Sequence, residues 1–66
     1  MKLKINGNET ALDDGLTVAG LLDHLRIEPG RVAVEVNMTI IKKCDLESHL
    51  LKDGDNVEIV NFVGGG

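Results

Sequence analysis

The sequence ends in Gly64, Gly65 and Gly66, so its most accessible reactive group is the α-carboxylate of Gly66. Three extended glycines reach at most about 10 Å, have no β-carbons, and tolerate backbone angles closed to other residues. Such a tail fits a narrow channel. A carboxylate is a poor electrophile, so acyl chemistry there requires activation, most simply as an adenylate made from ATP. No Walker-type phosphate loop is present, so a second protein would supply that activation. A frayed end without function is the alternative.

The other candidate side chains do not form a catalytic set. Cys44 is the only cysteine and has no partner for an internal disulfide. Its neighbours Lys42 and Lys43 could favour a thiolate, but we interpret it as a structural or incidental thiol. His24 and His49 have no cysteine or carboxylate at a recognised metal-ligand spacing. We therefore predict no metal site, no bound cofactor and no stand-alone active site, which means that partner enzymes would act on this chain.

The composition argues against several classes of function. Eleven acidic and seven basic residues give a net charge of -4, which disfavours nucleic-acid binding, and the single phenylalanine provides no stacking platform. No apolar run approaches the roughly 20 residues of a membrane-spanning helix. The 66 residues suffice for one small domain. The start, Met1–Ile5, does not resemble a signal peptide, so we expect a soluble, cytoplasmic protein that is monomeric when alone.

The beginning of the chain predicts a β-hairpin. Asn6-Gly7 is the pair best suited to a two-residue type I′ turn, in which both residues take positive φ. A turn at this position sets Lys4 opposite Glu9 and Leu3 opposite Thr10. One face of the hairpin then pairs opposite charges while the other collects apolar groups.

A helix is expected next, with Thr17 as its N-cap. Gly20 inside this helix suggests close packing against a sheet, and Pro29-Gly30 ends the segment. The apolar stripe that the helix would bury has the spacing i, i+3, i+4, i+7 and consists of Val18, Leu21, Leu22 and Leu25.

The rest of the chain predicts further strands joined by turns. A helix with one apolar face on one side of a mixed sheet of four to five strands gives an α+β fold. We place the domain at residues 1–63 and a flexible tail at 64–66. The expected segments are a strand at 32–36, a turn at 37–38, a short return strand at 40–41, an irregular stretch at 42–51, a turn at 52–55 and a strand at 57–60.

The last strand carries a candidate docking patch. If Val57 and Ile59 point into the core, the two-residue period of a strand sends Glu58, Val60 and Phe62 to the other face. Val60 and Phe62 would then be exposed beside the tail, which suggests a surface for a partner protein. Ordinary exposed apolar side chains are the alternative.

Three segments together resemble one family. These are the Gly-Gly-Gly end, Val32–Asn37 (VAVEVN) and Leu51–Ile59 (LKDGDNVEI). In this order they are similar to the ThiS family, the sulfur carrier proteins of thiamine biosynthesis. The resemblance implies a ubiquitin-like β-grasp fold with the first and last strands parallel at the centre of the sheet.

The resemblance also implies partners and site residues. A ThiF-like adenylating enzyme would activate Gly66 with ATP, a persulfide enzyme would supply sulfur to form a thiocarboxylate, and thiazole synthase (ThiG-like) would receive that sulfur. Gly64 and Gly65 would thread the tail into these partners. Three alternatives remain open: a molybdopterin-type sulfur carrier, a ubiquitin-like protein modifier, and a plain interaction domain.

Overall fold

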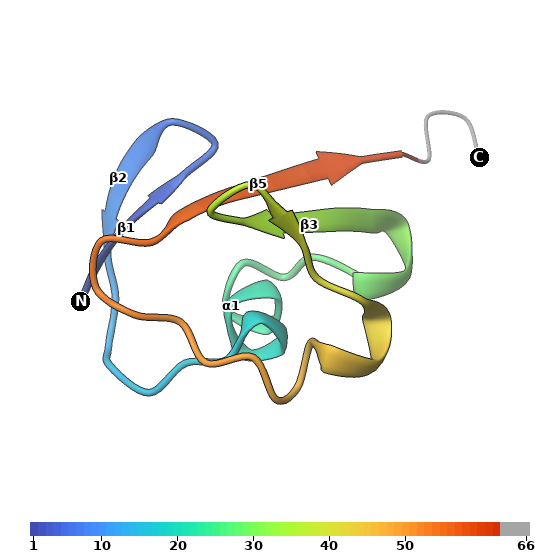
Figure 1. Ribbon diagram of the computed structural model, residues 1–66, viewed down its shortest axis with the longest axis horizontal. Helices are drawn as coiled ribbons and strands as arrows, with labels where there is room; N and C mark the ends of the chain where they lie inside the picture. The colour runs from blue at the N-terminus through green and yellow to red at the C-terminus, as the bar shows by residue number, and fades with distance from the viewer. Residues whose placement is uncertain (63–66) are drawn as a thin grey trace.

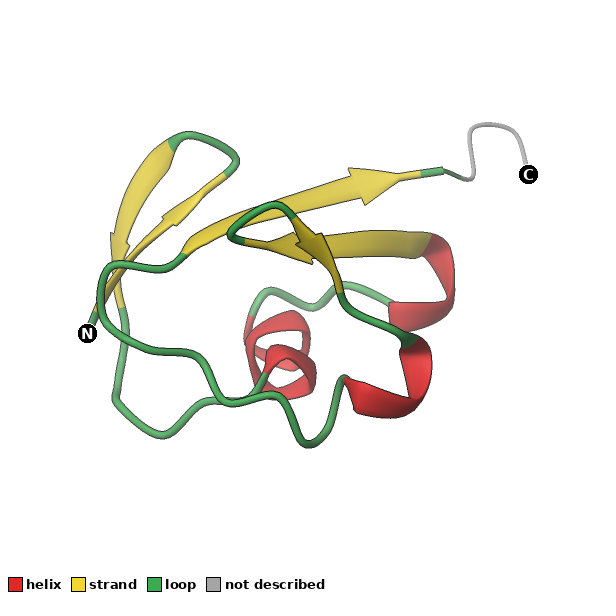
Figure 2. Ribbon diagram, viewed as in Figure 1, coloured by secondary structure: helices red, strands yellow, loops and turns green. Residues whose placement is uncertain are grey.

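The computed structural model describes residues 1–62, which form one mixed sheet with helical segments on one side (Figures 1 and 2). The elements in chain order are β1 (Lys2–Ile5), β2 (Asn8–Ala11), α1 (Val18–His24), the 3₁₀ turn η1 (Pro29–Arg31), β3 (Val32–Val36), β4 (Thr39–Ile40), the 3₁₀ turn η2 (Lys43–Asp45) and β5 (Asn56–Asn61).

The strand order in the sheet is β2-β1-β5-β3-β4. Strands β1 and β5 run parallel at the centre, and the other neighbouring pairs are antiparallel. This is the β-grasp arrangement that the sequence led us to expect. The predicted hairpin register is confirmed, with Lys4 opposite Glu9 and Leu3 opposite Thr10. Asn6 and Gly7 both have positive φ, 49° and 85°, as a type I′ turn requires.

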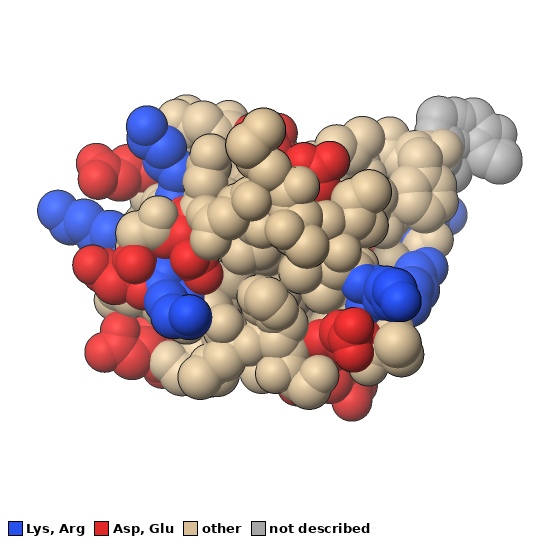
Figure 3. All heavy atoms as spheres, viewed as in Figure 1, with Lys and Arg blue, Asp and Glu red and all other residues tan. Residues whose placement is uncertain are grey.

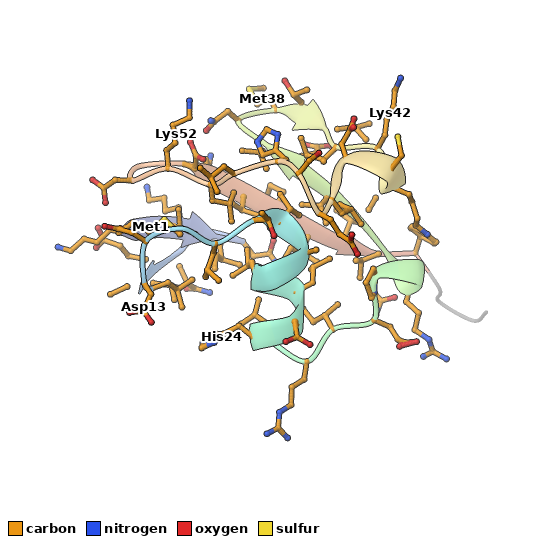
Figure 4. All side chains as sticks on the ribbon, turned by 90° about the horizontal axis from the view of Figure 1, so that it is seen from below. Met1, Asp13, His24, Met38, Lys42 and Lys52 are labelled. Carbon is orange, nitrogen blue, oxygen red and sulfur yellow. The ribbon has the colours of Figure 1, made fainter. Side chains whose placement is uncertain are left out.

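One face of the sheet is covered by α1, which lies across it in Figure 4. The Thr17 hydroxyl oxygen accepts a hydrogen bond from the backbone N–H of Gly20 at 3.1 Å, so the predicted N-cap is confirmed. The helix, alternate strand residues and the loop before β5 together form the core. Its buried members are Leu3, Val18, Leu21, Leu22, Val32, Val34, Val36, Leu46, Leu51 and Val57.

The end of α1 differs from the prediction, because Leu25 is exposed and does not join the buried stripe. The helix stops at His24, and Arg26 takes the left-handed conformation with φ 58°. The N–H of Ile27 then donates to the carbonyl of Leu22 at 2.9 Å. This Schellman-type ending turns the chain so that Ile27 packs against the core in place of Leu25.

Two smaller predictions also need correction. A β-carbon on Gly20 would meet side-chain atoms of Leu16 at 3.2 Å and Thr17 at 3.4 Å, so its close neighbours come from the turn before α1 and not from the sheet. The return strand is Thr39–Ile40, one residue earlier than expected. The turn before it has positive φ at both Asn37 and Met38.

The loop before β5 holds a buried carboxylate where we expected only turn residues. Asp55 is 8% exposed. One of its oxygens accepts from the backbone N–H of Lys52 at 2.8 Å and the other from the side-chain amide of Asn37 at 2.9 Å. The Asn37 side-chain oxygen in turn accepts from the N–H of Asn56. Asp55 thus joins the start of β5 to the β3–β4 turn.

Candidate docking face at the end of β5

The end of β5 is held unequally by its two neighbours. On the β3 side the pairing runs to Asn61, and the N–H of Phe62 donates to the Arg31 carbonyl at 3.2 Å. The β1 ladder includes only Asn56 and Val57. Beyond Val57, the Asn6 side chain makes the hydrogen bonds to β5 that a neighbouring strand would make.

The Asn6 side-chain oxygen accepts from the N–H of Ile59 at 2.7 Å, and its amide donates to the Ile59 carbonyl at 3.3 Å. One side-chain amide therefore supplies both hydrogen-bonding groups that a neighbouring strand residue would supply. It fixes the middle of β5 just before the chain reaches Val60. From the sequence, Asn6 was predictable only as a turn residue.

The face of the sheet away from α1 exposes Val60, at 51%, and Phe62, at 59%. Val57 on the opposite face is fully buried, so the predicted alternation is confirmed from Val57 to Val60. A docking role for Val60 and Phe62 stays a prediction. Gly64, Gly65 and Gly66, together with the predicted boundary after residue 63, lie outside the described residues.

Sequence reasoning missed other members of this open face. In the β3–β5 ladder Ala33 is opposite Val60, and Glu35 is opposite Glu58. Ile40 of β4 is opposite Glu35 and is 66% exposed. We call the set Ala33, Glu35, Ile40, Glu58 and Val60 the open-face patch. The sequence shows which residues of each strand share a face. It contains no local pattern that predicts how β3 and β5 are aligned with each other.

In the view of Figure 3, charged side chains gather mainly toward the two ends of the molecule. Figure 3 shows basic and acidic atoms mixed around the β1–β2 end, and an uncharged stretch with a few acidic atoms along the upper margin of the molecule. The only ion pair found within residues 1–62 joins the Met1 ammonium to Asp14 at 3.0 Å. The sheet is therefore not held together by ion pairs across the open face.

A hollow of about 340 Å³ lies at the β1 side and is lined by residues of both β-hairpin strands and the turn before β5. Lys2, Lys4 and Glu9 supply its charged groups. It contains no cysteine, histidine or hydroxyl side chain.

The other groups considered from sequence lie apart from the open face. Cys44 is an exposed free thiol in η2, with its sulfur 3.8 Å from an Asp45 carboxylate oxygen. His24 is exposed at the end of α1 (Figure 4), and His49 is half-buried in the loop between η2 and β5. Within residues 1–62, no group of histidine, cysteine and carboxylate side chains could hold a metal ion, and no helix is long and apolar enough to span a membrane.

Comparison with known proteins identifies the family to which this arrangement belongs. The sequence model of the ThiS family matches residues 3–66. The chain belongs to the ThiS family. A crystal structure of the thiamine biosynthesis protein ThiS from Geobacter metallireducens is similar over 100% of both chains, with a TM-score of 0.87 and 35% sequence identity. A solution structure of a thiamine biosynthesis protein from the same organism gives a TM-score of 0.83, again with 35% identity, over 100% of this chain and 88% of that one.

Among the relatives, similar sequences occur both as one segment of a longer protein and as nearly the whole of a short one. A thiazole synthase of Paramagnetospirillum magneticum is 44% identical over all 66 residues, and the ThiS-family chain spans only 20% of its length. The corresponding thiazole synthase of Magnetococcus marinus is 36% identical, with the same share covered. The uncharacterized protein ycf40 of Porphyra purpurea is 33% identical, and there the match covers 93% of the relative.

Proposed function

We propose that this chain is a sulfur carrier of thiamine biosynthesis that delivers sulfur for thiazole formation. Its full-length likeness to a thiamine biosynthesis protein, at 35% identity, is the observation that carries the proposal. The chain would be a substrate of partner enzymes and not itself an enzyme. A single cysteine without an internal disulfide partner fits a reducing compartment, and we place the carrier in the cytoplasm.

The chemistry proposed at Gly66 has two stages. A ThiF-like partner transfers AMP from ATP to the Gly66 carboxylate, releasing pyrophosphate. The terminal sulfur of a persulfide enzyme then attacks the activated carbonyl and expels AMP. A thiol cleaves the resulting S–S bond, which leaves a thiocarboxylate on Gly66 and a disulfide on the donor side. ATP is consumed by the partner, and the carrier holds no cofactor of its own.

The fold separates recognition from delivery in this proposal. Val60 and Phe62 are exposed on the open face next to the last residues of the chain. β5 pairs with β3 from Val57 to Asn61, the Phe62 N–H donates to the Arg31 carbonyl just before β3, and the Asn6 side chain holds Ile59. A partner that binds this face therefore receives Gly64, Gly65 and Gly66 from a fixed starting point. Glycines without β-carbons suit entry into a closed site from which water is excluded.

Intact-protein mass spectrometry tests the proposal. The full chain and a variant lacking Gly65 and Gly66 are each incubated with ATP, an adenylating partner and a cysteine-based persulfide source. We expect the full chain alone to gain the mass of one sulfur in place of one oxygen. All the hydrogen bonds described above lie within residues 1–62, so the truncated chain should give an unchanged circular dichroism spectrum.

Other products would favour other functions. Sulfur on the truncated chain, or none on a full chain that a competent partner adenylates, would contradict the proposal. Conjugates of higher mass that persist under reducing, denaturing conditions would indicate a protein modifier. Transfer of sulfur to a molybdopterin synthase large subunit, but not to thiazole synthase, would indicate the molybdopterin-type pathway.

A further inference from the structure

The open-face patch contains two carboxylates in an unfavourable position. Glu35 and Glu58 are direct partners in the antiparallel β3–β5 ladder. Side chains at such positions have β-carbons about 4.5–5.5 Å apart, and like charges placed directly opposite destabilise a sheet. An ordinary pair at this position would combine opposite charges, as Lys4 and Glu9 do in the β1–β2 hairpin.

Nearby cations of the described chain do not offset this repulsion through an ion pair. The one ion pair among residues 1–62 involves the N-terminus and Asp14, far from this ladder in the sheet. The strand beside β5 carries two cations, Lys2 and Lys4. The direct partner of Lys2 in the sheet is Ala11, and those of Lys4 are Glu9 on one side and Asn56 on the other. Glu35 is half-buried and Glu58 is exposed, and neither forms an ion pair within residues 1–62.

Apolar side chains surround the two carboxylates. Ile40 lies opposite Glu35 on β4, and the next outward-facing pair of the β3–β5 ladder is Ala33 with Val60. A protein surface that covers Ile40 and Val60 must also remove water from the carboxylates between them. Burying an unpaired charge is costly, so a complementary surface has to bring a cation. The planar guanidinium of arginine, with five donors, can serve two carboxylates at once.

We propose that the open-face patch docks onto thiazole synthase through an arginine side chain of the synthase, which lies between Glu35 and Glu58 with apolar groups against Ile40 and Val60. This inference rests on the proposed function. The choice of partner comes from the relatives, since two thiazole synthases carry a segment that is 44% and 36% identical to the whole chain. In those proteins a domain like this one is covalently tied to the synthase.

Direct binding to purified thiazole synthase tests the inference. The variants are Glu35→Gln, Glu58→Gln and the double substitution, and Glu47→Gln is the matched control because it removes one exposed carboxylate outside the sheet. We expect each single variant to bind about tenfold more weakly than the unmodified chain and the double variant more weakly still. The Glu47→Gln variant should bind within twofold of the unmodified chain.

A second measurement distinguishes binding from folding. Because the two carboxylates repel each other, the Glu35 and Glu58 variants should unfold at an unchanged or higher urea concentration. Weaker binding together with undiminished stability would support the docking role. Equal binding by all variants, or weaker binding explained by a lower unfolding midpoint, would overturn it.

The same variants separate this inference from the proposed function. If the unmodified chain acquires sulfur and binds the synthase while the glutamine variants bind equally well, the carrier function stands and the arginine contact is wrong. If the Glu35 and Glu58 variants are no longer adenylated but still bind thiazole synthase normally, the assignment of this patch to thiazole synthase is wrong. If the unmodified chain neither acquires sulfur nor binds the synthase, both proposals are wrong.

Discussion

The two faces of the sheet are built from the same strands but differ in what contacts them. On the covered face, Leu3, Val34 and Val57 pack against α1 and are almost completely buried. On the open face, Ile40 and Val60 are more than half exposed, and none of the described elements covers them. The apolar residues of the covered face are explained by folding, whereas those of the open face are not.

Under the proposed function, the covered face serves stability and the open face serves recognition. Because strand side chains alternate between faces, neighbouring residues of β5 can serve different purposes. A 66-residue domain has few residues to spare and a stability of only a few kcal/mol. Substitutions on the two faces should therefore have separable effects, which the following experiments measure.

The largest contrast is expected between Val57→Ala and Val60→Ala, the same chemical change made twice in one strand. Val57 is 0% exposed, so removing two methyl groups leaves a cavity in the core and should lower the free energy of unfolding by about 2–3 kcal/mol. Val60 is 51% exposed, and its substitution should cost less than about 1 kcal/mol. Urea denaturation measures both. Equal losses would contradict the separation of the two faces.

A second comparison uses the two aspartates that flank Gly54. Asp55→Ala removes a buried acceptor from the Lys52 N–H and the Asn37 side chain, and should destabilise the fold by about 2 kcal/mol. Asp53 is exposed and accepts only from the N–H of Lys2, at 2.6 Å. We expect Asp53→Ala to cost less than about 1 kcal/mol in the same denaturation experiment. A larger loss from Asp53→Ala would show that the hairpin edge, and not the Asp55 network, fixes the start of β5.

The features that sequence predicted well are local ones. Asn6-Gly7 specified a turn, and the turn fixed the register of the β1–β2 hairpin without knowledge of the rest of the fold. Thr17 marked the start of α1 in the same way, because an N-cap acts on an N–H three residues later. In β5, the two-residue period was enough to predict that Val57 is buried and Val60 exposed.

The features that sequence missed depend on contacts between distant segments. After α1, Arg26 takes a left-handed conformation that is usually found at glycine. Because no glycine marks this position, the sequence did not predict that Ile27 would pack against the core in place of Leu25. The pairing of Glu35 with Glu58 depends on the β3–β5 register, which only the folded sheet defines. The ThiS resemblance predicted the overall fold correctly, and its assignment of Gly66 stays a prediction. The open-face patch required the structure.

The two type I′ turns provide a third experiment. Met38 has φ 72° at the position where the β1–β2 hairpin has Gly7, and its side chain is 88% exposed. A left-handed conformation costs a residue with a β-carbon about 1–2 kcal/mol. Met38→Gly should therefore raise the free energy of unfolding by about 1 kcal/mol, measured by thermal denaturation. The control is Met38→Ala, which removes the side chain but keeps the β-carbon and should not stabilise.

Phe62→Ala should have the smallest effect on stability and is the sharpest test of the open face. The ring is 59% exposed, and the substitution leaves the Phe62 N–H free to keep its hydrogen bond to the Arg31 carbonyl. We expect the free energy of unfolding to change by less than about 0.5 kcal/mol, while binding to thiazole synthase weakens. A stability loss as large as that of Val57→Ala would assign Phe62 to the fold. Unchanged stability with unchanged binding would show that this exposed ring is not part of the docking surface, and the recognition role of the open face would then depend on Val60, Ile40 and the carboxylate pair.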